Sequence, residues 1–196
     1  MALYSSNEKM NKIDEDRIWV DRVLRGEKEA FGPLVERHQN SIFTLVKRIV
    51  KDSDEAQDLT QTIFIKAYEA LHTFNGKSLF STWLNSIAYN AAVGFYRKKK
   101  PLHQSFDEQL PSGFWLLNTE EDPMEKEVLL QQLENALAKL NAEDNALIHF
   151  YYTQNYSIER ISEITRQTPS NVKVRLFRIR KKLSEMMQNQ PETCLN

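Results

Sequence analysis

The segment 80–100 places neutral polar groups, aromatic rings and a run of cations along one expected helix. At the 100° step of a helix, one arc is apolar and should be buried; it carries Phe80, Leu84, Ile87, Ala88, Ala91 and Phe95. The opposite arc should be exposed; it carries Thr82, Asn85, Ser86, Tyr89, Asn90, Val93, Tyr96 and Arg97. Amides and hydroxyls can hydrogen-bond base edges, aromatic rings can stack on unpaired bases, and the cations at 97–100 can hold phosphates. The pattern indicates a nucleic-acid surface; a half-buried helix packed under the segment 101–122 is the alternative.

A second basic helix is expected over 169–188, after a short helix and a turn that together are typical of a helix-turn-helix. Ser157 and Thr168 stand at the N-cap positions of the two helices. One apolar stripe of the second helix is formed by Val172, Leu176, Ile179 and Leu183. The outward positions are Ser170, Asn171, Lys173, Val174, Arg175, Phe177, Arg178, Lys181 and Lys182. A recognition helix inserts its N-terminal residues into the major groove while basic side chains hold the backbone. An amphipathic basic helix with a solvated face, or one that binds RNA or an acidic protein, is the alternative.

The sequence shows no recognisable pattern of residues for catalysis or metal binding. The four histidines show no metal-ligand spacing, and the single cysteine is Cys194. A glycine-rich phosphate loop and a nucleophile–base–acid set are both missing from the sequence. We therefore expect a protein that is not an enzyme and that uses no cofactor, no metal and no small-molecule substrate.

The sequence offers no segment suited to a membrane. Residues 1–11 are polar and lack the apolar core of a signal peptide. The longest uncharged stretch, 78–96, carries too many polar side chains for a membrane span. We expect a cytoplasmic protein without membrane insertion.

The elements that position these two surfaces are all expected to be helices. With Gly 5 and Pro 6 among 196 residues, the chain is too poor in turn formers for a β-sandwich. Apolar spacing predicts helices over 14–25, 27–50, 53–71, 81–99, 123–140, 142–152, 158–165 and 169–188. Ser53 and Asn141 are the expected N-caps of two of them. The fold class is therefore all-α, with two small helical domains and the second a helix-turn-helix domain.

The segment 101–122 differs from both halves and is expected to be an acidic linker. From 101 to 125 the chain carries six Asp or Glu and no Lys or Arg, whereas 169–183 carries six Lys or Arg and no acid. The net charge of −1 excludes a uniformly basic DNA-coating protein. We expect the acidic segment to fold back on the basic helix, so that the free chain binds duplex DNA poorly.

Taken in this order, three segments resemble an extracytoplasmic-function sigma factor of the sigma-70 family. DEAQDLTQTIF (54–64) is similar to the core-polymerase-binding helix, and FSTWLNSIAYN (80–90) resembles the promoter-melting segment. NVKVRLFRIR (171–180) is similar to the minus-thirty-five recognition helix. The resemblance implies a region 2-like domain over 14–100, a linker over 101–122 and a region 4-like domain over 123–188.

The resemblance also implies roles for particular residues and partners. Contacts with core RNA polymerase would come from Asp54, Asp58, Gln61 and Thr62. Contacts with the unpaired minus-ten DNA would come from Trp83, Ser86, Tyr89, Asn90, Arg97 and Lys98. Contacts with the minus-thirty-five duplex would come from Ser170, Asn171, Lys173, Val174, Arg175 and Arg178. The implied partners are core polymerase, promoter DNA and an anti-sigma factor.

The chain departs from the family pattern in three places, which involve four residues. Gly94 stands where the family often has Asp, and Asn141 replaces a usual Pro. Arg166 and Gln167 occupy the helix-turn-helix turn, where Gly and an apolar residue are usual, so mild strain is expected at a left-handed position there. Two other interpretations stay open: a helix-turn-helix regulator that acts without polymerase, and a protein of another class, either a helical adaptor or an enzyme with an unrecognised site.

Overall fold

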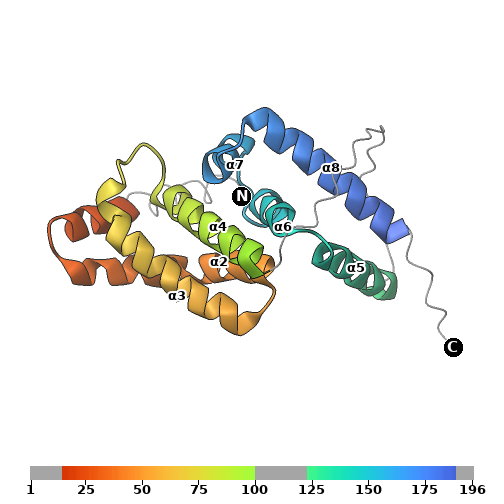
Figure 1. Ribbon diagram of the computed structural model, residues 1–196, viewed down its shortest axis with the longest axis horizontal. Helices are drawn as coiled ribbons and strands as arrows, with labels where there is room; N and C mark the ends of the chain where they lie inside the picture. Colours follow the sequence, from red (N-terminus) through yellow and green to blue (C-terminus); the bar gives the residue numbers. More distant parts are fainter. Residues whose placement is uncertain (1–14, 100–122, 189–196) are drawn as a thin grey trace.

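The computed structural model describes residues 15–99 and 123–188, and every regular element in these ranges is helical (Figure 1). This confirms the all-α class. The first domain consists of a helix over 15–24, η1 (Lys28–Phe31), α2 (Gly32–Val50), α3 (Ser53–Ala70), η2 (Leu71–Thr73) and α4 (Phe80–Lys99). The second consists of α5 (Pro123–Ala138), α6 (Ala142–Ile148), the π-helical turn η3 (His149–Thr153), α7 (Ile158–Thr165) and α8 (Pro169–Gln188). The expected acidic linker lies outside the described residues.

The core of the first domain lies among α2, α3 and α4. Apolar residues at three- and four-residue steps turn one face of each helix inward, and Leu34, Leu45, Ile49, Ile63 and Leu84 are fully buried. Two expected boundaries were wrong. The helix expected over 27–50 is interrupted, because η1 ends where Gly32 and Pro33 begin α2. The N-cap of α3 is Asp52 rather than Ser53, since the Asp52 carboxylate accepts hydrogen bonds from the backbone N–H groups of Asp54 and Glu55.

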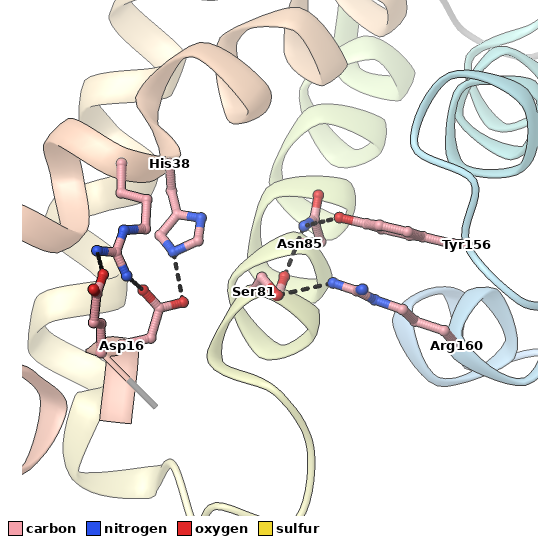
Figure 2. Close-up of polar contacts among 8 residues, drawn as sticks. Asp16, His38, Ser81, Asn85, Tyr156 and Arg160 are labelled. Atoms are coloured by element: carbon pink, nitrogen blue, oxygen red, sulfur yellow. Dashed lines mark hydrogen bonds and ion pairs between the residues drawn. The ribbon is translucent and has the colours of Figure 1, made fainter. Parts of the chain in front are cut away.

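The helix over 15–24 is held to α2 by a buried carboxylate. Asp16 Oδ1 accepts a hydrogen bond from Arg37 Nη1 at 2.9 Å, and Asp16 Oδ2 lies 2.9 Å from His38 Nε2 (Figure 2). A buried carboxylate is tolerated only when it is paired in this way. Asp16 therefore fixes the first helix at the edge of the domain.

The second domain has the predicted helix-turn-helix. The stripe Val172, Leu176, Ile179 and Leu183 is buried, as predicted. Ser157 caps α7 by accepting from the N–H of Arg160, and the Thr168 hydroxyl accepts from the N–H of Asn171. Arg166, in the turn, has φ 56° and ψ 35°, so the expected left-handed position is present and has no glycine.

The two domains pack against each other, which the sequence did not predict. α4 lies against α7 and α6, and α2 lies against α6. In Figure 1, α4 runs between the helices of its own domain and those of the second. Lys51, which ends α2 at φ 70°, reaches across to the C-terminal end of α5, where its ammonium donates to the carbonyls of Ala138 and Leu140.

Candidate nucleic-acid interface

Half of the face of α4 that was expected to be exposed is covered, which corrects the sequence-based expectation for four of its eight residues, whereas Asn90 and Arg97 are exposed as expected. Thr82, Asn85, Tyr89 and Val93 are all buried, with exposed fractions of 3, 4, 6 and 6%. On the arc expected to be fully buried, Ile87, Ala91 and Phe95 are only half-buried. The physical reason is that α4 has two partners: its own domain covers one side, and the second domain covers the other.

Two side chains of the second domain reach the N-terminal half of this face. Arg160 of α7 donates from Nη2 to the Ser81 hydroxyl at 2.8 Å, and Asn85 donates from Nδ2 to the Tyr156 hydroxyl at 3.4 Å (Figure 2). The Arg160 guanidinium also lies 3.6 Å from the centroid of the Tyr156 ring. Burial lowers the pKa of Arg160 and raises that of Tyr156, so both groups sit in a desolvated contact.

The residues predicted for minus-ten DNA are placed in different environments along α4. Trp83 is half-buried beside the rings of Phe74 and Phe80. Tyr89 faces the ring of Phe150, and burial, with Glu143 adding to it, raises the Tyr89 pKa to about 12. Ser86 is half-buried, while Asn90, Arg97 and Lys98 are exposed. The structure thus places the predicted set on one helix but leaves only its C-terminal part open to solvent.

The residues predicted for minus-thirty-five DNA lie at the N-terminal half of α8. Ser170, Asn171, Lys173, Val174 and Arg178 are exposed. Arg175 is half-buried and engaged: its Nη2 lies 2.7 Å from Glu143 Oε2, and its Nε lies 2.7 Å from Asp144 Oδ1. Arg175 and Arg178 therefore differ in surroundings even though both belong to the basic face.

One carboxylate joins the two predicted DNA surfaces. Glu143, in the first turn of α6, pairs with Arg97 of α4 through Oε1 and with Arg175 of α8 through Oε2. Burial acts to raise the Glu143 pKa, but the hydrogen bonds and charges of the two arginines outweigh it and leave the pKa lowered. Burial likewise acts to lower the Arg175 pKa, and Asp144 and Glu143 raise it overall.

Sequence reasoning missed Glu143, Asp144, Tyr156 and Arg160 as members of this site. Acidic residues in the first turn of a helix are ordinary, because they favour the helix dipole. Nothing local marks Glu143 as a partner of an arginine 46 residues away. Only the packing of the domains brings these groups together.

The residues predicted for polymerase contact share one exposed face of α3. Asp54, Asp58, Gln61 and Thr62 are all exposed, and the Thr62 hydroxyl donates to the carbonyl of Asp58 within the helix. The next turn adds Ile65, an apolar side chain that is 60% exposed. An acidic and polar face that continues into an exposed apolar residue is suited to a protein contact.

The structure shows the surroundings of two residues that depart from the family pattern, Gly94 and Asn141. Gly94 sits in α4, where an added Cβ would meet no atom within 4 Å, so a larger side chain would fit there. Asn141 caps α6 by accepting from the N–H of Asp144 at 2.8 Å, which is the role expected of it.

Within 15–99 and 123–188, no group of three or more His, Cys, Asp or Glu side chains could hold a metal ion. In the same ranges, no helix has the length and apolar character to cross a membrane.

Family models match both halves of the chain. Residues 34–101 match the model described as sigma-70 region 2, and residues 130–183 match sigma-70, region 4. The RNA polymerase sigma-H factor of Pseudomonas aeruginosa is 33% identical over 184 residues, which cover 89% of this chain and 95% of that protein. The ECF RNA polymerase sigma-E factor of Escherichia coli K12 is 33% identical over 181 residues, covering 88% and 94%.

Solved structures share the fold. The structure of CnrH in complex with the cytosolic domain of CnrY matches with a TM-score of 0.65 at 22% identity, over 89% of this chain and 97% of that one. The sigma factor RpoE in complex with the anti-sigma factor NepR, from Bartonella quintana, matches with a TM-score of 0.59 at 20% identity, over 83% and 99%.

Proposed function

This chain belongs to the sigma-70 family of RNA polymerase sigma factors, in its extracytoplasmic-function group, and we propose that its two helical domains divide promoter reading between them. As a sigma factor it binds core RNA polymerase and directs promoter recognition. In the proposal, the domain over 14–100 binds core polymerase and opens the minus-ten element, and the domain over 123–188 reads the minus-thirty-five duplex. The segment 101–122 links the two domains. The catalytic work belongs to the polymerase, so the chain itself is not an enzyme and acts in the cytoplasm.

The observation that carries the proposal is the construction of α8. Its apolar stripe is buried, while Ser170, Asn171 and Lys173 stand exposed at its N-terminal end, followed by Arg178. Recognition helices read bases with residues at this end and hold phosphates with cations further along. We assign base contacts to Ser170, Asn171, Val174 and Arg175, and phosphate contacts to Lys173 and Arg178.

On α4, the residues proposed to hold the unpaired minus-ten strand are Trp83, Ser86, Tyr89 and Asn90, with Arg97 and Lys98 on phosphates. Replacing Tyr89 or Asn90 with Ala should reduce open-complex formation more than closed-complex binding, because stacking or a base contact is worth on the order of 1–3 kcal/mol. Permanganate reactivity of thymines on a promoter that the wild-type holoenzyme melts measures this. Unchanged reactivity in both variants contradicts the assignment.

Polymerase binding is proposed for the exposed face of α3, and it gives the most direct test. Asp58→Arg should weaken core binding roughly tenfold, because tenfold in affinity is about 1.4 kcal/mol and a like-charge contact with a basic partner surface costs at least that. Glu29→Arg makes the same charge change on exposed η1 and serves as the matched control. Titration of labelled core polymerase measures both variants. Normal binding by Asp58→Arg refutes the placement, and no binding by the wild type favours a regulator that acts without polymerase.

We further propose an anti-sigma factor as a partner. Two sigma-like structures that share this fold are complexes, one with the cytosolic domain of CnrY and one with the anti-sigma factor NepR. Affinity purification of the chain from the cells that produce it, followed by mass spectrometry, should recover a protein that competes with core polymerase for it. Recovery of polymerase subunits alone contradicts this part of the proposal.

A further inference from the structure

We propose that Asn141 and Asp144, which lie outside the recognition helix, position Arg175 for a base contact in the minus-thirty-five element. Asn141 is the N-cap of α6, and Asp144 lies in the first turn of that helix. The inference rests on the proposed function, because the base contact of Arg175 is assigned there. Arg175 is in place before DNA arrives, and two residues that touch no base determine where it points.

Asn141, Asp144 and Arg175 form a positioning network that runs from the N-cap of α6 to α8. Asn141 Nδ2 donates to Asp144 Oδ2 at 2.8 Å, while Asn141 Oδ1 accepts from the backbone N–H of Asp144, also at 2.8 Å. Asp144 Oδ1 accepts from Arg175 Nε at 2.7 Å. The amide of Asn141 has one satisfactory orientation, because the reverse would set its oxygen against the carboxylate. The Asn141 amide therefore fixes the carboxylate that holds the guanidinium.

Arg175 is held along one edge of its guanidinium. Besides the contact of Nε with Asp144, its Nη2 lies 2.7 Å from Glu143 Oε2. A guanidinium presents five N–H donors in one plane, and these contacts use two of them. The side chain keeps 27% of its surface exposed. The edge that carries Nη1 can therefore donate to a base while the other edge stays bound to α6.

The two arginines assigned to DNA on α8 are held differently. Arg178 is exposed, whereas Arg175 is half-buried between two carboxylates. A base contact needs a donor at a defined place, because only the acceptors of the right base pair match it, whereas a phosphate contact carries no sequence information. An arginine that is already held also loses less side-chain freedom on binding. The contrast fits a base contact for Arg175 and a phosphate contact for Arg178.

Asn141 makes the network a property of this chain rather than of the family pattern, in which proline is usual at this position. Proline has no side-chain amide, so it could not donate to Asp144. A chain with proline there would lack the donor that fixes the carboxylate. The departure at position 141 therefore adds positioning of Arg175 to the helix capping that any good N-cap residue provides.

The test uses holoenzyme, assembled from core polymerase and the full chain. The probe is a pool of promoter duplexes derived from one that the wild-type holoenzyme melts, with the minus-thirty-five segment randomised. Sequencing of the bound duplexes gives the base preference at each position. Arg175→Ala locates the position that Arg175 contacts, because the preference is lost there. Glu143 is left unchanged in all variants, because it also pairs with Arg97 of α4.

Two variants of the positioning network change the charge in opposite directions. Asp144→Ala removes the carboxylate and one negative charge. Asn141→Asp adds one negative charge and sets two carboxylates against each other, while aspartate remains as good an N-cap as asparagine. Glu134→Gln and Gln131→Glu make the same two charge changes at exposed positions of α5 and are the matched controls.

Both network variants should lower the base preference at the Arg175 position by on the order of tenfold, because one good side-chain contact to a base discriminates by about that factor. The preference at the other positions and the affinity for core polymerase should stay as in the wild type. In an Arg175→Ala background neither substitution should change the preference further, because both act through Arg175. The controls should keep the wild-type preference, since a charge alone changes affinity for all sequences alike.

Wild-type preference at the Arg175 position in Asp144→Ala overturns the proposal, and in Asn141→Asp alone it overturns the part played by Asn141. An equal loss at every position, or a further loss in the Arg175→Ala background, also overturns it, since the network would then hold α8 as a whole. So does wild-type preference at every position in Arg175→Ala. Failure of the proposed function is distinct: the wild-type holoenzyme would select no sequence in the randomised segment, and this inference would fall with it.

Discussion

Replacing His149 with Gln should remove a pH dependence from the stability of the fold. His149 is 1% exposed, in the π-helical turn after α6. Its Nε2 lies 3.3 Å from Gln154 Nε2, and its Nδ1 has no hydrogen-bond partner among the described residues. Burial, with the charge of Arg48 adding to it, lowers the pKa of His149 from 6.5 to about 4. The folded state therefore holds the ring neutral.

The direction and the magnitude of this pH dependence follow from proton linkage. The ring of His149 binds a proton more readily in the unfolded chain than in the folded one. The free energy of unfolding is therefore highest above pH 6.5 and decreases as the pH falls from 6.5 toward 4. Between about pH 7.5 and about pH 5, a shift from 6.5 to about 4 corresponds to a loss of about 2 kcal/mol in the free energy of unfolding. Half of that loss would already be measurable.

The assay is urea unfolding followed by far-ultraviolet circular dichroism at several pH values. The free energy of unfolding of His149→Gln should fall less on acidification than that of the wild type, by about 2 kcal/mol over this range. His72→Gln, a substitution at an exposed histidine of η2, should keep the wild-type pH dependence. Equal slopes for wild type and His149→Gln, or an NMR titration in which the His149 ring protonates near 6.5, would refute the reasoning.

Three further substitutions test local features by urea unfolding. Arg166→Gly should raise the free energy of unfolding by about 0.5–1 kcal/mol, because φ 56° is strained for a residue with a Cβ; a loss of stability contradicts this. Asp52→Ala should lower it by about 1 kcal/mol through loss of the α3 cap, and Asp52→Ser should recover most of it; equal losses would show that capping is not the cause. Phe150→Ala should lower it by about 3–5 kcal/mol, because the ring is fully buried and stacked on Tyr156; a loss under about 1 kcal/mol would mean that the ring is not packed as described.

Features set by near neighbours in the chain could be predicted from the sequence. The stripe from Val172 to Leu183 follows from helical periodicity alone, and the caps at Ser157 and Asn141 follow from side-chain chemistry one turn away. The N-cap of α3 shows where such a prediction can be wrong by one residue. Asp52 and Ser53 are both good cap residues, and only the extended backbone conformation of Asp52 decides between them.

The covered face of α4 could not be predicted, because its partners are distant in sequence. Asn85 and Tyr156 are 71 residues apart, and periodicity describes only how one helix presents its faces. A face of amides, hydroxyls and tyrosine suits both a nucleic acid and a polar protein surface. The surroundings of Arg175 were hidden for the same reason, since Glu143 and Asp144 are ordinary first-turn acids until α6 packs beside α8.

The contacts between α4 and the second domain join α4 to residues that are synthesised much later on the ribosome. They span 46 residues for Arg97 and Glu143 and 79 residues for Ser81 and Arg160. At the usual rate of synthesis these distances correspond to about 2–16 s, during which the first domain can fold before α6 and α7 exist. Every nascent chain thus passes through a stage in which the second domain does not yet cover Asn85 and Tyr89. In a chain truncated before α6, these two residues would never be covered by that domain.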